Sequence, residues 1–113
     1  MPTPASAKGR DGENRAATYL EARGYRIVQR NVRLPGGELD LVCKDGETIV
    51  FIEVKLRNTK SFGSALGSVD FRKRATLRRL ASDYLQFMAP NARARFDIVA
   101  LDGERITLHK NAF

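Results

Sequence analysis

The spacing of hydrophobic residues alternates along the chain between the period of a helix and the period of a strand. Ala16, Ala17 and Leu20 recur at helical intervals before Gly24, a residue type that commonly follows the end of a helix. Short β-branched and apolar runs follow, and helical periodicity returns later. The pattern predicts helices from about Lys8 to Gly24 and at 69–88, and strands at 25–32, 38–43, 48–55, 95–101 and 105–110.

Turn residues between the predicted strands indicate hairpins. An Asp-Gly pair favours a type I′ turn, in which both central residues have positive φ, and a Pro-Gly pair favours a type II turn. The predicted turns are Asp45-Gly46 and Asp102-Gly103, both of type I′, and Pro35-Gly36, of type II. If Asp45 and Gly46 are the central residues, Asp40 lies opposite Phe51. Glu53 is then its diagonal neighbour on the same face, roughly 7–8 Å away.

The second predicted helix has an apolar side and a basic side. The apolar residues follow i, i+3, i+4 spacing and predict a core contact: Leu77, Leu80, Ala81, Tyr84, Leu85 and Met88. The opposite side carries Arg72, Lys73, Arg74, Arg78 and Arg79. Cations in a first turn oppose the helix dipole, so helix stability does not explain them. A phosphate-bearing partner would explain them, and a solvated face is the alternative.

Composition predicts one globular domain with a polyanionic partner. Hydrophobic residues make up 42% of the 113 residues and charged residues 29%, as in soluble domains. We expect residues 1–8 to form a flexible tail and 9–113 a single domain. The net charge is +7, which favours nucleic acid, an anionic surface or solubility alone. No apolar run is long enough to span a membrane and no signal-peptide core is present, so we expect no membrane partner and a cytoplasmic location. The single cysteine, Cys43, excludes an internal disulfide and is expected to be a buried hydrophobe.

Three ionisable residues interrupt the two apolar strands at 38–43 and 48–55. Asp40, Glu53 and Lys55 would be costly to bury without partners or a bound cation. Carboxylates suit Mg²⁺, and the carbonyl of Val54 could add a ligand. Lys55 would then orient a water molecule or stabilise charge on phosphorus, as in a phosphodiesterase. The alternative is a buried salt bridge from Glu53 or Asp40 to Lys55.

Further acidic residues have a structural and a functional interpretation. Glu13 shares the core-facing side of the first helix, where it would bind a metal or position water, unless it only stabilises the helix dipole. Glu38 is a reserve carboxylate, and we expect an ion pair with Arg30 or Arg33. For Asp97 we expect a structural pair with a neighbouring arginine, and a position near the site is the alternative.

The glycine-bearing loop at 56–68 directly follows the strand with Glu53 and Lys55. We expect either a flap that closes over substrate or a plain connector. The predicted nucleic-acid contacts are Arg30, Arg33, Arg57, Arg72, Lys73 and Arg74.

A set of short motifs in fixed order covers nearly the whole chain. They are Gly9–Glu13, Arg30–Arg33, Gly37–Val42, Phe51–Arg57, Phe62-Gly63, Arg72-Lys73, Arg95–Val99 and Asn111–Phe113. The set resembles the YraN-like family of small bacterial proteins in the PD-(D/E)XK nuclease superfamily, which is similar in fold to archaeal Holliday-junction resolvases. Leu39 stands where that superfamily has its signature proline.

The resemblance implies a fold, an activity and a site. The fold would be α/β (α+β) with a restriction-endonuclease-like core, in the order helix, three strands, helix, two strands, and a mixed sheet flanked by helices. Glu13, Asp40, Glu53 and Lys55 would be the active-site residues, with Mg²⁺ or Mn²⁺ as cofactor. The substrate would be DNA rather than RNA, including branched or junction DNA, and the chain could form a homodimer. The alternative function is a nucleic-acid-binding module with the nuclease fold and little or no turnover.

Overall fold

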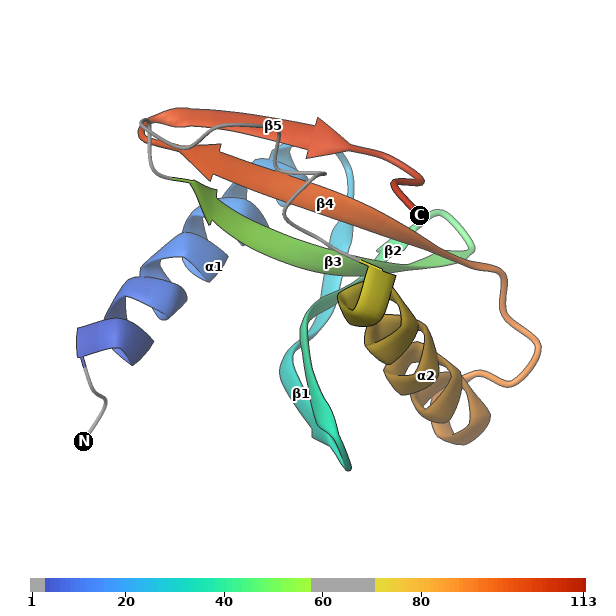
Figure 1. Ribbon diagram of the computed structural model, residues 1–113. Coiled ribbons are helices and arrows are strands. Elements are labelled where there is room, and N and C mark those ends of the chain that lie inside the picture. Colours follow the sequence, from blue (N-terminus) through green and yellow to red (C-terminus); the bar gives the residue numbers. More distant parts are fainter. Residues whose placement is uncertain (1–3, 58–70) are drawn as a thin grey trace.

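The computed structural model follows the predicted order of helix, three strands, helix and two strands (Figure 1). It describes residues 4–57 and 71–113, and within them the side chains of 11–56 and 71–113. The elements are α1 (Pro4–Ala22), β1 (Arg26–Leu34), β2 (Gly37–Asp45), β3 (Thr48–Arg57), α2 (Phe71–Met88), β4 (Ala94–Asp102) and β5 (Arg105–His109). In the described part of the chain, neither helix has the length and apolar character needed to cross a membrane.

The five strands form one mixed sheet in the order β1-β2-β3-β4-β5. Neighbouring strands are antiparallel except for β3 and β4, which run parallel. Parallel neighbours need a crossover connection, and the segment containing α2 supplies it. The predicted α+β class and the mixed sheet flanked by helices are therefore confirmed.

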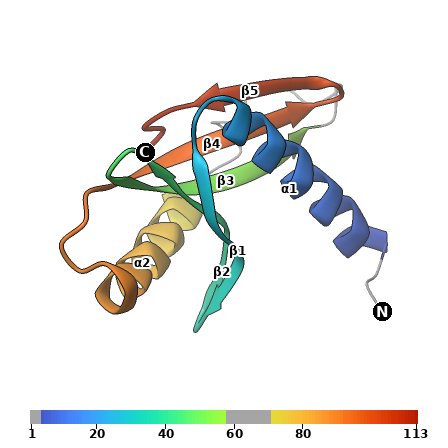
Figure 2. The same cartoon turned by 180° about the vertical axis from the view of Figure 1, so that it is seen from behind.

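The two helices pack on opposite faces of the sheet, as the opposed views of Figures 1 and 2 show. Leu77, Leu80 and Tyr84 of α2 pack against one face, in a core that includes Phe51 of β3. Ala16 and Leu20 of α1 pack against the other face, in a separate core. The apolar residues of β2 and β3 therefore pack into one core or the other, which explains the nearly continuous apolar runs of these two strands.

Several predicted boundaries are corrected by one to four residues. The first helix begins at Pro4 rather than at Lys8, so it extends into the segment for which a flexible tail was predicted. Proline is compatible with a first helical turn, where its missing N–H has no partner to lose. The predicted strands at 25–32 and 105–110 are shifted, to Arg26–Leu34 and Arg105–His109. Met88 was assigned to the core, but it ends α2 and is 61% exposed.

Two hairpins turn one residue later than predicted. Asp45 pairs with Thr48, so Gly46 and Glu47 are the central residues of the β2–β3 turn. Gly46 has a positive φ of 63° and Glu47 does not, which excludes the predicted type I′ turn. The β4–β5 turn is displaced in the same way, to Gly103-Glu104. The Pro35-Gly36 turn is confirmed, with Leu34 paired to Gly37 and a φ of 94° at Gly36.

The tip of the β1–β2 hairpin lies against α2. Arg79 donates a hydrogen bond to the carbonyl oxygen of Pro35 at 3.2 Å. A Cβ atom at Gly37 would come within 2.9 Å of a methyl group of Leu80, so Gly37 is required for this close approach. The hairpin thereby holds the start of β2 near α2, and the next residues of β2 carry the candidate site.

Candidate metal centre

Asp40 lies where β2 and β3 stop pairing. Their recorded pairs end at Leu41 and Ile52, and beyond that point the Asp40 carboxylate accepts a hydrogen bond from the Val54 backbone N–H at 2.9 Å. The side chain thus replaces a missing strand partner. The N–H and C=O of one strand residue project to the same side, so the Val54 carbonyl also faces the Asp40 side of β3.

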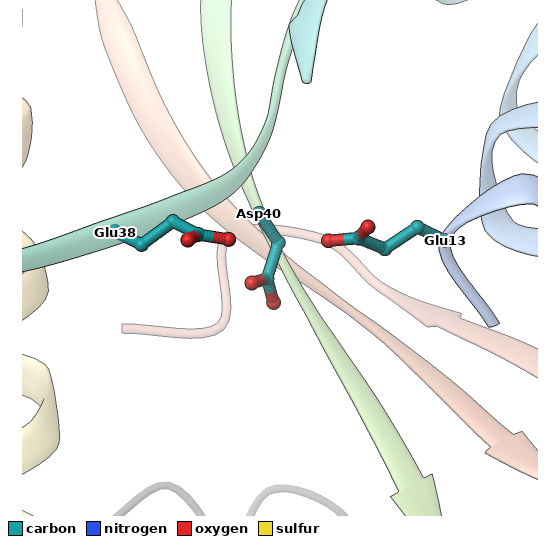
Figure 3. Close-up of side chains that lie close together, drawn as sticks. All are labelled: Glu13, Glu38 and Asp40. Atoms are coloured by element: carbon teal, nitrogen blue, oxygen red, sulfur yellow. The ribbon is translucent and has the colours of Figure 1, made fainter. Parts of the chain in front are cut away.

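Three carboxylates meet in this gap. Glu13 from α1, and Glu38 and Asp40 from β2, each offer an oxygen atom within 4.8 Å of the others. Figure 3 shows Glu38 and Glu13 extending toward each other from opposite sides, with Asp40 between them. The corrected register does not separate Asp40 from Glu53. It places them directly across from each other when the β2–β3 pairing is continued by one position.

Burial and nearby negative charge make two of these carboxylates, Glu13 and Asp40, reluctant to ionise. Burial raises the pKa of Glu13, and the neighbouring Asp40 and Glu38 charges raise it further. Burial also raises the pKa of Asp40, against the lowering effect of the Val54 N–H and of Lys73. A bound cation would relieve both the desolvation and the repulsion.

Glu53, which lies across from Asp40 on β3, is more buried than the three carboxylates of the cluster, with 6% of its surface exposed. Burial and the Asp40 charge raise the pKa of Glu53 to about 7. Its recorded ion pair is with Lys73 of α2, with 3.4 Å between Nζ and Oε1. The alternative interpretation, a salt bridge from Glu53 or Asp40 to Lys55, is not found among the side chains that the structure describes.

A cavity of about 230 Å³ opens beside the carboxylates. It is lined by Glu13, Asp40, Val54, Lys55 and Leu56. All candidate ligands are oxygen atoms, which suits Mg²⁺ and Mn²⁺ rather than a softer metal. Lys55 is half-buried at the wall of the cavity, where its ammonium group could reach a molecule held there. The residues present therefore fit a hard divalent cation.

The structure brings together most, but not all, of the predicted metal ligands. Glu13 and Asp40 are in the cluster as predicted, and Val54 contributes backbone beside them. Glu53 neighbours Asp40 but is directed to Lys73, and Glu38 takes the third place in the cluster. The sequence feature that could have identified Glu38 as a ligand was its position two residues before Asp40, on the same face of the strand.

Lys73 was predicted to lie on the basic side of α2, opposite the core, and this is wrong. It stands four residues before the buried Leu77, so the two share one side of the helix and Lys73 reaches Glu53. The i, i+4 relation to Leu77 was the signal that could have identified it.

The other predicted nucleic-acid contacts have varied surroundings. Arg33 pairs with Glu38 at 3.4 Å, which confirms the expected ion pair, and its side chain is 87% exposed. Arg30 donates to Asn14. Arg72 is exposed, and Arg74 lies 5.8 Å from the ring centre of Phe113. The side chain of Arg57 and most of the predicted flap, at 58–68, lie outside the described residues.

Two residues considered for chemistry have structural roles. Asp97 is fully buried and binds Arg95 at 3.0 Å and the Tyr25 hydroxyl at 2.9 Å, which confirms the predicted arginine pair. Arg95 also reaches Asp45 at 2.7 Å, so the network ties β4 to the β2–β3 turn. Cys43 is buried, and burial raises the pKa of its thiol to about 12, as expected for an unreactive core residue.

Comparison with known proteins identifies relatives along nearly the whole chain. The model of "Uncharacterised protein family UPF0102" matches residues 12–101. A UPF0102 protein of Shewanella loihica is 48% identical over 106 residues, covering 94% of this chain and 93% of the relative. One from Dechloromonas aromatica is 44% identical over 108 residues, covering 96% and 89%. One from Moorella thermoacetica is 50% identical over 95 residues, covering 83% and 79%. The chain therefore belongs to protein family UPF0102.

Proposed function

We propose that the protein is a metal-dependent endonuclease of the PD-(D/E)XK type, which hydrolyses phosphodiester bonds of DNA with Mg²⁺ or Mn²⁺. The observation that supports this most directly is the cluster of Glu13, Glu38 and Asp40. Two of its members, Glu13 and Asp40, line one cavity together with Lys55. Carboxylates with raised pKa values need a reason to be together, and a hard cation supplies one.

Each residue has a defined part in this proposal. Glu13, Glu38 and Asp40 would hold the cation, and Glu53, across from Asp40, would complete the ligand set. The Val54 carbonyl faces the same space. When bound, Mg²⁺ or Mn²⁺ would polarise the phosphoryl group and favour ionisation of an attacking water. Lys55, at the cavity wall, would orient that water and stabilise negative charge developing on the phosphorus.

The charge of the whole chain supports a nucleic-acid substrate. Net charge is +7 even though the candidate site is acidic, so the basic residues lie elsewhere and would attract a polyanion. Arg72 is exposed at the start of α2 and directly precedes Lys73, which reaches the Glu53 carboxylate. Phosphates bound there would bring a phosphodiester bond to the cavity.

Incubation of the purified protein with supercoiled and branched DNA tests the activity. We expect cleavage with Mn²⁺ and none with EDTA. Asp40→Asn, which retains an acceptor for the Val54 N–H, and Lys55→Ala should each lower the rate by about 10²-fold or more. Glu47→Gln removes an exposed carboxylate in the β2–β3 turn and should cleave like wild type.

The outcomes separate catalysis from binding alone. DNA binding without cleavage at any divalent concentration would favour the alternative, a binding module with a nuclease fold. Cleavage that survives Lys55→Ala would contradict the role given to Lys55. Cleavage that survives Asp40→Asn would contradict the assignment of the site.

A further inference from the structure

The ion pair between Lys73 and Glu53 joins α2 to the carboxylate cluster. Glu53 is 93% buried at its side chain, whereas the Lys73 side chain is 46% exposed. A buried carboxylate needs a counter-charge, and a flexible ammonium on a half-exposed stem can supply it without being fixed in place. The Glu53 carboxylate is therefore held inside the fold, and the Lys73 ammonium group reaches it from a half-exposed position.

Lys73 acts on more than one carboxylate. Its charge favours ionisation of Asp40 as well as of Glu53, and for Glu53 its effect exceeds that of Lys55. Lys73 thus has the electrostatic role that a cation in the cluster would have. Both would compete for the negative charge of the Glu53 carboxylate, because an ammonium contact withdraws charge from the oxygen atoms that a metal would bind.

The position of Glu53 agrees with such competition. Its carboxylate belongs to the Lys73 pair and not to the group formed by Glu13, Glu38 and Asp40, although it adjoins Asp40. To become a ligand, Glu53 would have to exchange one positive partner for another. In the first turn of α2 the ammonium also opposes the helix dipole, which weakens its hold on that position.

We infer that Lys73 is an internal counter-ion that occupies Glu53 until a divalent cation displaces it, so that metal binding releases Lys73 from the site. This inference rests on the proposed function, because it takes the cluster to be a metal site. Its consequence is a lower metal affinity than the carboxylates alone would give, since part of the binding free energy is used to displace Lys73 from Glu53.

Calorimetric titration with Mn²⁺ alone, without DNA and at pH 8, tests the competition. Lys73→Met should lower the Kd for Mn²⁺ by about three- to tenfold, the factor expected for removing a competing ion pair of this exposure. Lys73→Arg keeps the charge and should stay within about twofold of wild type. Arg72→Met, the neighbouring cation on the same helix, measures the effect of losing one positive charge without losing the pair.

An unchanged or higher Kd in Lys73→Met, relative to Arg72→Met, would overturn the inference and leave the metal site intact. Absence of Mn²⁺ binding in wild type and variants alike would overturn the proposed function together with the inference. A second measurement needs no variant: the side-chain NMR signals of Lys73 should shift as Mg²⁺ is added and saturate with the same Kd. A Lys73 signal that stays constant while Mg²⁺ binds would also overturn the inference.

Discussion

Glu53 is a buried acid whose ionisation opposes folding. Its folded-state pKa is about 7, against an ordinary value of 4.5. A carboxyl group that holds its proton more tightly in the folded state stabilises the fold below the unfolded pKa. That contribution is lost as the pH rises through the folded pKa. The metal-free protein should therefore become less stable between about pH 4.5 and 7.

Glu53→Gln should remove the decrease in stability that occurs as the pH rises. In EDTA at pH 8 it should raise the free energy of unfolding by on the order of 1–2 kcal/mol. The gain is smaller than the pKa difference alone implies, because the ion pair between Lys73 and Glu53 is lost. Thermal unfolding from pH 5 to 8 measures it. Glu47→Gln, at an exposed position, should keep the wild-type pH dependence. A Glu53→Gln variant that is less stable than wild type at pH 8 would contradict the account.

The predictability of the site differs from residue to residue. Asp40 and Glu53 were identifiable because each places a charge in an apolar strand, and burial makes that costly. The choice of Glu38 over Glu53 in the cluster was not predictable, because it depends on where Lys73 approaches from α2. Sequence spacing fixes neighbours within one element, but not the rotation of a helix against a strand.

Among the elements, the β2–β3 hairpin shows why a turn can be located while its register is missed. The turn moved by one residue, and the pairing moved by two: Lys44 faces Ile49 rather than Glu47. A shift of two residues keeps every side chain on its face of the sheet, so the hydrophobic pattern is identical in both registers. Only the turn geometry distinguishes the two registers. In this turn Gly46 has a positive φ, whereas Asp45 and Glu47 do not.

The contact between the β1–β2 hairpin and α2 leads to a stability prediction. Gly37→Ala should destabilise the fold by about 1–3 kcal/mol, because the new Cβ would lie 2.9 Å from a methyl group of Leu80. Denaturant unfolding measures the loss. In a Leu80→Val background the same change should cost less, since the smaller side chain has less to displace. Equal costs in the two backgrounds would show that Leu80 is not what makes alanine unfavourable at Gly37.

For the whole molecule, the order of elements followed from local periodicity, whereas the packing of helices on both faces was implied by family resemblance. Alternation and helical stripes are local, so one strand or one helix can be recognised alone. Which strands neighbour each other depends on contacts far apart in sequence, such as Phe51 of β3 beside Phe96 of β4. The homodimer stays a prediction.

The net charge of +7 leads to a prediction about salt. If Arg72 contacts a phosphate, Arg72→Ala should reduce the slope of log K against log salt concentration for DNA binding by about 0.9. Titrations between about 50 and 200 mM salt measure the slope. Arg105→Ala, which removes an exposed arginine on the edge strand β5, is the matched control and should leave the slope unchanged. Equal slopes in wild type and Arg72→Ala would remove Arg72 from the contact surface.

The two separate cores have a consequence for the newly made chain. Glu13 belongs to the helix that covers one face of the sheet, and Lys73 belongs to the helix that covers the other face. Asp40 and Glu53 lie on the strands between the two helices. A chain in which the first of these helices has not docked lacks Glu13 in the cluster and so has an incomplete ligand set. If the protein cuts DNA, such a half-folded copy would not yet have the complete site.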